Sequence, residues 1–222
     1  MYLVAGLGNP GREYEGNRHN VGFMLVDLLA ERWSSGPFRE KFKGEFAKTS
    51  YRGEEVVLLE PMTYMNLSGE SVQRAMAFFK VPLEKLVVVH DELDLPFGTF
   101  RIKLGGGAAG HKGLKSITQH CGGDGYARVR VGIDRPAGRS TESYVLSDFP
   151  ASDRAELPDL LVKVADAVQC IVREGPQVAM NRYHRSPPRK GRRRSAAAPE
   201  PEGGQTPAEE PASPEEPPEG ST

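Results

Sequence analysis

The spacing of apolar residues alternates along the chain between a pattern typical of strands and one typical of helices. Runs that are almost wholly apolar, at Tyr2–Ala5, Val56–Glu60 and Leu86–His90, predict buried strands. Regular alternation of apolar and polar residues over Gly98–Lys103 and Ala127–Ile133 predicts two further strands, each with one exposed face.

Between these strands, apolar residues recur every three or four positions, as they do along one face of a helix. This spacing predicts helices over Asn20–Trp33, after Ser68 as an N-cap, and along a C-terminal segment that includes Leu160–Ile171. A glycine-rich stretch after Lys103 leads into a further short helix. Because strands and helices alternate, we expect a single α/β domain with helices on both faces of one sheet.

Composition narrows the class of protein. The chain has 222 residues, of which 38% are hydrophobic and 27% charged, which suits one ordinary globular domain. No apolar stretch reaches the roughly 18–20 residues of a membrane span, and Met1–Ala5 lacks the features of a secretory signal. Cys121 and Cys170 have no metal-type spacing and are interpreted as free thiols. These features predict a cytoplasmic protein without membrane contact.

The composition changes abruptly at Arg185. Residues 185–194 are basic without an acid, and the remainder to Thr222 is acidic without a base and rich in Pro, Ala and Gly. Such a segment buries too little apolar surface to offset its ordering entropy. We therefore predict a folded domain over residues 1–184 and a disordered tail over residues 185–222. The basic run either adds affinity for nucleic acid or belongs to a solubilising extension without an essential role.

Gly6, Gly8 and Gly11 form the pattern G-x-G-x-x-G directly after the first predicted strand, as in dinucleotide-binding turns. In those turns the glycines open a helix at once, and the pyrophosphate lies on its N-terminus. Here the helical spacing begins only near Asn20, so the context of the pattern argues against a dinucleotide. We expect these glycines instead to shape a loop that presents Asn9.

Polar residues follow the predicted strands, and open α/β sheets bind their ligands beyond the carboxyl ends of strands. We therefore expect these residues to converge on one rim of the sheet. In chain order they are Asn9, Tyr14, His19, Tyr64, Asn66, Asp91, His111 and Lys112.

His19 and Asp91 together form the minimal unit of a general base. The carboxylate holds the imidazole in one tautomer and stabilises its protonated form. The sequence has no G-x-S-x-G nucleophile elbow, and Ser68 is explained as a helix cap, so we expect a water molecule as the attacking group. The amides of Asn9 and Asn66 both donate and accept hydrogen bonds, which suits a carbonyl or a peptide backbone.

Each of these residues also has an ordinary structural interpretation. A histidine near a helix start is often structural, and carboxylates at a strand end are usually solvated or capping. No second histidine cluster completes a metal site around His90–Asp94, so we expect no metal. The glycine-rich loop suits either a simple connection or phosphate contact through backbone N–H groups near Lys112 and Lys115. Tyr14 and Tyr64 could also be packing residues.

Four segments of the chain resemble the bacterial-type peptidyl-tRNA hydrolases: GLGNPGREYEGNRHNVGF, PMTYMNLSG, VVVHDELDLPFG and KLGGGAAGHKGLKS. RVRVGIDRP and NRYH match as well, so the resemblance covers about residues 1–184 and leaves the tail outside. It implies a monomeric α/β hydrolase with a mixed, twisted sheet that needs no metal or organic cofactor. It also implies cleavage of the ester between a peptide and the 3′-terminal ribose of tRNA, which recycles tRNA from stalled or aborted translation.

The resemblance also implies roles for individual residues. His19 corresponds to the base that activates water, Asp91 to its supporting carboxylate, and Asn9 to the residue that distinguishes a blocked peptide from a free aminoacyl group. The residues implied to line the site are Tyr14, Tyr64 and Asn66, and those implied to contact tRNA phosphates are Lys103 and Arg130. The expected basic patch for these phosphates consists of Lys103, Lys112, Lys115, Arg128 and Arg130.

Lys112 is a departure from the family pattern, which has Asn where this chain reads GHKG. Lys cannot accept a hydrogen bond and adds a charge, so it is expected to bind a phosphate or the terminal ribose, or to weaken a peptide contact. This substitution and the basic run at residues 185–194 keep a second interpretation open, a relative that binds RNA without hydrolysis. His19, Asp91, Asn9 and Asn66 favour the hydrolase. A nicotinamide-dependent enzyme is a third interpretation.

Overall fold

A seven-stranded sheet organises the protein, whose computed structural model describes residues 1–136, 138 and 140–184. The strands are β1 (Tyr2–Gly6), β2 (Arg39–Lys41), β3 (Gly44–Tyr51), β4 (Glu54–Pro61), β5 (Leu86–Glu92), β6 (Phe100–Leu104) and β7 (Ala127–Gly132). The helices are α1 (Val21–Arg32), α2 (Ser68–Phe79), α3 (Lys112–His120), α4 (Thr141–Val145), α5 (Ala151–Glu174) and α6 (Pro176–Tyr183). The predicted tail over residues 185–222 lies outside the described residues.

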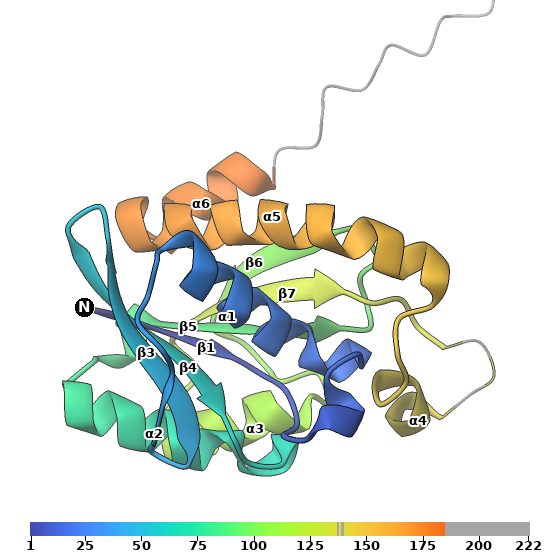
Figure 1. Ribbon diagram of the computed structural model, residues 1–222, viewed down its shortest axis with the longest axis horizontal. Helices are drawn as coiled ribbons and strands as arrows, with labels where there is room; N and C mark the ends of the chain where they lie inside the picture. Colours follow the sequence, from blue (N-terminus) through green and yellow to red (C-terminus); the bar gives the residue numbers. More distant parts are fainter. Residues whose placement is uncertain (137, 139, 185–222) are drawn as a thin grey trace, which may run out of the picture. The chain divides into compact units, whose positions relative to one another are not determined.

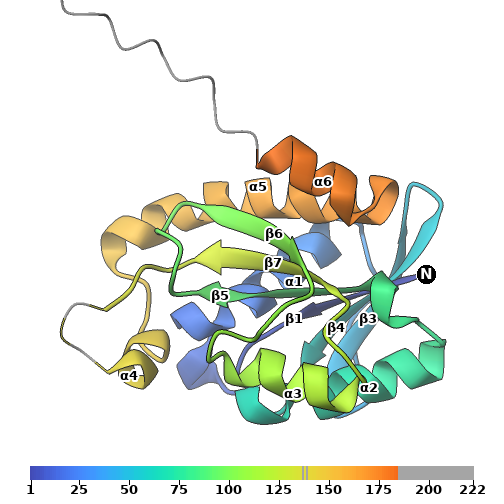
Figure 2. The ribbon, with the colours of Figure 1, turned by 180° about the vertical axis from the view of Figure 1, so that it is seen from behind.

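Helices cover both faces of the sheet, as the sequence predicts. Figure 1 shows α1 and α5 on one side of the sheet and α2 and α3 on the other, and Figure 2 shows the same layers from behind. Alternate residues of β1 enter the two cores: Val4 packs with Leu25 and Val164, whereas Leu3 packs with Val72 and Ile117. The period of two along a buried strand therefore creates two apolar layers.

The sheet is mixed, and the direction of its strands decides where the site lies. β1 pairs in parallel with β4 and with β5, and β5 pairs in parallel with β7. The carboxyl ends of these strands therefore lie along one edge. β3 and β6 run in the opposite direction, whereas β2, antiparallel to β3, runs in the same direction as β4. The expectation that residues after every strand gather directly at the carboxyl edge is therefore wrong for β6.

The glycine-rich loop follows β6 and leads the chain back to the edge where β1, β4 and β5 end. It begins beside Ala127, the residue paired with Leu104, and reaches the N-terminus of α3 at His111. Arg128 fixes its first part, since its guanidinium donates to the carbonyl oxygens of Gly106 at 2.5 Å and Gly107 at 2.8 Å. Arg128 is only 2% exposed. The prediction that it belongs to a phosphate-binding patch is therefore wrong.

The hairpin of β2 and β3 was not predicted from the sequence. Its turn places Phe42 and Lys43 at φ of 63° and 55°, a region that non-glycine residues seldom adopt. Phe42 is buried and packs against Phe46, Phe78 and Phe79, and these contacts favour the turn despite its backbone. Hairpin prediction relies on Asn-Gly or Asp-Gly turns, and this turn contains neither.

The glycines of the opening pattern serve close packing and a loop. A Cβ on Gly6 would lie 2.2 Å from the carbonyl oxygen of Gly22 in α1, and one on Gly8 would lie 2.8 Å from the ring of Phe23. Gly11 has a φ of 120°. Helix α1 begins only at Val21, so no α-helix starts at the glycines as a dinucleotide turn requires.

Ser68 is the first residue of α2 and not its N-cap. The capping position is Leu67, without a side-chain hydrogen bond, and the Ser68 hydroxyl donates backwards to the Met65 carbonyl at 2.9 Å. A short 3₁₀ turn over Met65–Leu67 runs directly into α2 and takes the place of a capping side chain. The prediction of a Ser68 cap is therefore wrong, although the helix itself is confirmed.

Two expectations from composition concern the chain as a whole. Cys121 and Cys170 are free cysteines, as predicted. Within the described residues, no helix combines the length and apolar character that crossing a membrane requires.

Candidate active site

A pocket of about 750 Å³ lies at the edge where β1, β4 and β5 end. It brings together polar residues from well-separated parts of the sequence. All the residues expected on this rim line it: Asn9, Tyr14, His19, Tyr64, Asn66, Asp91, His111 and Lys112. The predicted convergence on one rim is therefore present, and residues from α4 form a further wall that was not predicted.

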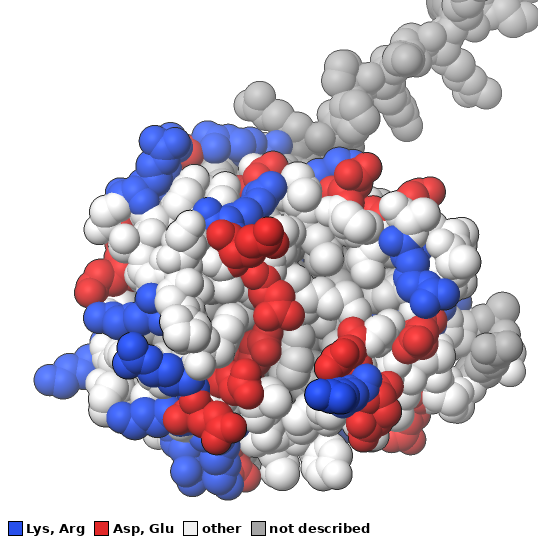
Figure 3. All heavy atoms as spheres, viewed as in Figure 1, with Lys and Arg blue, Asp and Glu red and all other residues white. Residues whose placement is uncertain are grey.

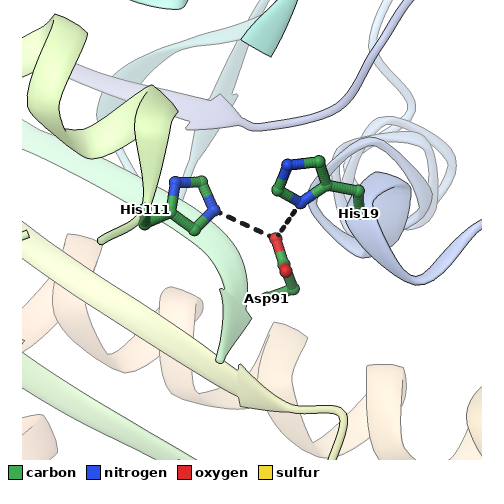
Figure 4. A group of neighbouring side chains, drawn as sticks. All are labelled: His19, Asp91 and His111. Carbon is green, nitrogen blue, oxygen red and sulfur yellow. Dashed lines mark hydrogen bonds and ion pairs between the residues drawn. The ribbon is translucent and has the colours of Figure 1, made fainter. Parts of the chain in front are cut away.

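Asp91 lies between two histidines at the base of this pocket (Figure 4). His19 Nδ1 lies 2.7 Å from Asp91 Oδ1, and His111 Nε2 lies 3.0 Å from the same oxygen. The carboxylate is 2% exposed and the His19 side chain 12% exposed. A buried acceptor that receives two donors is well satisfied, so the geometry fixes both rings.

The tautomer of His111 follows from its contacts at the start of α3. Its Nδ1 accepts hydrogen bonds from the backbone N–H groups of Gly113 and Leu114, at 3.2 and 3.3 Å. The proton of the neutral ring is therefore on Nε2, which donates to Asp91. His111 is thus the N-cap of α3 and a hydrogen-bond donor at the same time.

The electrostatics of Asp91 differ from those of most buried carboxyls. Burial raises the pKa of Asp91, but the neighbouring His19 and His111 outweigh it and hold this pKa well below its ordinary range. The adjacent His90 is fully buried, and burial, followed by the effect of His111, lowers the pKa of His90 to about 3. Asp91 is therefore an anion at neutral pH, while His90 beside it is neutral.

The same three side chains have the composition of a metal site, since the nearest ligand atoms of His19, Asp91 and His111 lie within 4.8 Å of one another. Their hydrogen bonds do not fit that interpretation. Metal binding at His111 Nε2 would move its proton to Nδ1, which already accepts from two backbone N–H groups. The donor set suits proton transfer better than metal coordination.

Asn9 is held on three sides by the protein. Its Oδ1 accepts from the backbone N–H of Met65 at 2.9 Å. Its backbone N–H donates to Asn20 Oδ1 at 3.0 Å, and its carbonyl accepts from Asn20 Nδ2 at 2.9 Å. Because Oδ1 is engaged, the side-chain NH₂ is the group that remains for a ligand in the pocket. Asn9 therefore presents a donor, aimed by Asn20 and Met65.

Arg18 connects the turn that bears His19 to the segment after α4. Arg18 Nη1 donates to Ser147 O at 3.1 Å, Ser147 Oγ at 2.7 Å and Asp148 O at 2.7 Å. Its guanidinium carbon lies 4.2 Å from the ring centroid of Tyr144. This buried arginine thus positions the inner side of α4 relative to His19.

The outer rim of the pocket is more exposed. Tyr64 is 65% exposed, and Asn66 is also exposed. Lys112 Nζ lies 3.0 Å from Glu142 Oε1, so an ion pair joins α3 to α4 across the rim. Lys103 and Arg130 lie outside the pocket lining, on β6 and β7.

Several residues that build the site carried no clear signal in the sequence. His111 was recognised at the rim but not assigned a role. Asn20 and Arg18 were overlooked because they act only through partners far away in the sequence. Helix α4 was not predicted because its five residues are too few to show a periodic pattern of apolar positions.

Comparisons with known proteins add an independent result. The family model described as Peptidyl-tRNA hydrolase matches residues 3–191. The peptidyl-tRNA hydrolase of Sorangium cellulosum is 54% identical over 196 residues, which are 87% of this chain and 87% of that protein. That of Frankia casuarinae is 52% identical over 184 residues, covering 82% of this chain and 93% of that protein. The crystal structure of peptidyl-tRNA hydrolase from Acinetobacter baumannii matches with a TM-score of 0.77 at 35% identity, covering 82% of this chain and 94% of that chain.

Proposed function

Since the chain belongs to the peptidyl-tRNA hydrolase family and hydrolyses peptidyl-tRNA, we propose that His19 activates the attacking water and that Asp91 supports it. The fold and the activity that the resemblance implies are thereby confirmed. The observation that carries the proposed mechanism is the pair of hydrogen bonds on Asp91 Oδ1 inside the pocket.

The position of the proton on the His19 ring supports its role as the base. An anionic Asp91 accepts from His19 Nδ1–H, so Nε2 of the neutral ring is free to accept a proton. Nε2 takes a proton from water as the water oxygen bonds to the ester carbonyl carbon. The bond from that carbon to the ribose oxygen then breaks, and the proton passes from Nε2 to the leaving oxygen. Asp91 stabilises the imidazolium between these steps.

Asn9 supplies the selection for a blocked amino group in this proposal. A peptidyl group carries an acyl carbonyl next to the reacting residue, whereas a free aminoacyl group carries an ammonium there. The side-chain NH₂ of Asn9 donates to a carbonyl but repels an ammonium. Tyr14, Tyr64 and Asn66 line the space around the peptide and the tRNA terminus.

We assign contact with tRNA phosphates to the paired strands β6 and β7. Lys103 pairs in register with the buried Arg128, and Arg101 with Arg130, so Arg101, Lys103 and Arg130 lie on one face of these strands. Lys103 and Arg101 are exposed, while Arg130 also pairs with Glu92 at 2.8 Å. Activity at subsaturating tRNA is therefore expected to fall as salt rises, because phosphate binding releases counterions.

The remaining expectations on the working form of the protein are also part of the proposal. We propose that the protein acts as a monomer, as its resemblance to the family implies. Free cysteines and a substrate made by translation support a cytoplasmic location. We assign the hydrolase domain to residues 1–184; the predicted tail over residues 185–222 lies outside the described residues.

The decisive experiment measures release of an N-acetylated aminoacyl group from tRNA, with the unblocked aminoacyl-tRNA as a second substrate. The native protein is expected to cleave the blocked ester only. His19→Ala is expected to lower kcat by about 10²–10⁴-fold, the usual contribution of a general base.

His120→Ala is the matched control, because His120 is an exposed histidine at the end of α3 and outside the pocket lining. It is expected to retain native activity. Full activity of His19→Ala would contradict the assigned base. Tight tRNA binding without cleavage by the native protein would favour the RNA-binding alternative and direct attention to Lys112.

A further inference from the structure

The ion pair at the pocket rim joins two elements without being part of the packed interior. Lys112 is the first residue of α3, and Glu142 lies in the first turn of α4. Their side chains are 64% and 71% exposed, although both residues line the pocket. An exposed pair of this kind contributes little stability, so its partners exchange readily. A ligand that fills the pocket therefore lies against both side chains.

The position of Lys112 makes it a site for an anion. The N-terminus of α3 already presents the positive end of the helix dipole, and a lysine there adds to that charge. The carboxylate of Glu142 pairs with this positive charge. Glu142 lies in the first turn of its own helix, where an acidic residue is favourable. Lys112 in turn lowers the pKa of the Glu142 carboxyl. The carboxylate of Glu142 therefore occupies a place suited to any oxyanion.

We propose that Lys112 exchanges Glu142 for a phosphodiester of the tRNA 3′ end when the substrate binds. This inference rests on the proposed function, which places the terminal ribose beside His19. The phosphate of the terminal nucleotide is one ribose away from the reacting ester, so it lies at the rim while the ester lies at the base. Lys is a point-charge phosphate ligand. Glu142 is thus an internal competitor of the tRNA.

The exchange has a consequence for selectivity. A substrate with a phosphate at this place replaces one Lys112 partner by another, so the cation remains paired throughout. An ester without phosphates leaves the Lys112–Glu142 pair intact and gains nothing from it. Lys112 therefore favours tRNA-borne esters over small esters of similar shape, by a charge contact rather than by the pocket wall, and Glu142 reduces this preference.

The test is equilibrium binding of deacylated tRNA, measured by fluorescence anisotropy between about 50 and 200 mM salt. Lys112→Gln is expected to weaken binding several-fold and to reduce the slope of log Kd against log salt by about 0.7–0.9, the loss of one phosphate contact. Lys112→Arg is expected to keep the native slope. Glu142→Gln is expected to tighten binding about three-fold, because Lys112 is then unpaired.

The double variant Lys112→Gln with Glu142→Gln separates exchange from simple repulsion. Under the proposal it binds tRNA as Lys112→Gln alone does, since Glu142 acts only through Lys112. Equal tightening by Glu142→Gln in both backgrounds would overturn the proposal and make Glu142 a general repulsive charge. An unchanged salt slope in Lys112→Gln would overturn it as well.

Glu55→Gln is the matched control. Glu55 pairs with Lys48 at 3.1 Å, with exposed fractions of 58% and 49%, and lies outside the pocket lining. The variant removes the same charge and is expected to leave Kd within two-fold of the native value; tightening equal to that of Glu142→Gln would overturn the proposal. Binding of deacylated tRNA involves no ester cleavage, so a failure of the proposed catalytic residues would not be mistaken for a failure of this exchange.

Discussion

Asp91 and Glu60 are two buried carboxyls on the strands that flank β1, and their surroundings are opposite. Asp91 receives two histidine donors on one oxygen. Glu60 Oε1 has no hydrogen-bond partner among the described residues. Glu60 also faces like charges, because Glu45 is its direct partner in the adjacent strand and Asp27 is close by on α1.

The pKa values of the two groups diverge accordingly. Burial, followed by the charges of Asp27 and Glu45, raises the pKa of Glu60 to about 8. For Asp91 the histidines outweigh burial and lower the pKa. Burial keeps Glu60 neutral because no cation among the described residues pairs with it, whereas the two histidines beside Asp91 outweigh burial and keep that carboxyl charged. At neutral pH Asp91 is the charged carboxyl of the pair, and Glu60 is mainly the neutral one.

Acidic side chains also gather on the surface. Figure 3 shows them as a band down the middle of the face that carries α1 in Figure 1. The pKa of Asp27 on α1 is also raised, by burial and then by the charges of Glu45 and Glu15. One region of the molecule thus places histidines around a carboxyl, and another places carboxyls around a carboxyl.

The comparison is tested most strongly by neutralising each carboxyl in turn. Asp91→Asn is expected to lower kcat by about 10²-fold or more, because the imidazolium of His19 loses its counter-charge. Glu60→Gln replaces a mostly neutral acid by a neutral amide and is expected to keep kcat within two-fold. Steady-state cleavage of N-acetylaminoacyl-tRNA measures both. Equal losses in the two variants would show that burial, and not the histidine pair, matters for activity.

A smaller effect is expected from removing one of the two donors to Asp91. His111→Ala is expected to lower kcat about 10-fold, which corresponds to about 1.4 kcal/mol in the barrier. It also removes the cap of α3 and is expected to reduce the free energy of unfolding by about 1 kcal/mol.

His111→Asn distinguishes the two roles, since Asn is a good N-cap but does not carry the imidazole Nε2–H. It is expected to restore the unfolding free energy without restoring kcat. Recovery of kcat together with stability would mean that His111 acts only through the fold. Denaturant unfolding and single-turnover cleavage provide the two readouts.

The pH dependence of stability sharpens the comparison further. The pKa of Glu60 is higher in the folded protein than its ordinary 4.5, so its contribution is fully present below pH 4.5 and is lost as pH rises toward about 8. Glu60→Gln is therefore expected to match the native protein at pH 4.5 and to be more stable by about 1–3 kcal/mol above pH 8. Asp91 has the opposite sign, because its contribution is lost on acidification.

The smallest expected effect is that of a single neighbouring charge. Glu45→Gln removes one of the charges that raise the pKa of Glu60, while burial remains. It is expected to recover only a minor part of the high-pH stability gained in Glu60→Gln. Urea unfolding at pH 5 and pH 9 compares the two variants, and a gain from Glu45→Gln equal to that from Glu60→Gln would contradict burial as the main cause.

The two regions differ in how far the sequence predicts them. The position of Asp91 follows from an apolar strand that ends in polar residues, and the approach of His19 was expected from the same rule. The role of His111 was not, because β6 runs antiparallel and only the fixed glycine loop brings His111 back. The like-charged surroundings of Glu60 were not predicted either, since its opposite neighbour Glu45 lies in an unpredicted hairpin. A strand with a strong apolar run can be predicted from its local sequence, whereas the register and direction of its pairing depend on residues far away in the sequence.

The pocket draws its lining from residues as far apart as Asn9 and Leu146. Asn9 is fixed through Met65, and Arg18 needs Ser147 and Asp148, so neither half of the site is complete alone. During synthesis a domain folds as a unit once its sequence is available. A growing copy of this enzyme, itself attached to a tRNA, therefore has no working site until most of its domain has been translated. The fold thus delays the appearance of an activity that acts on nascent chains.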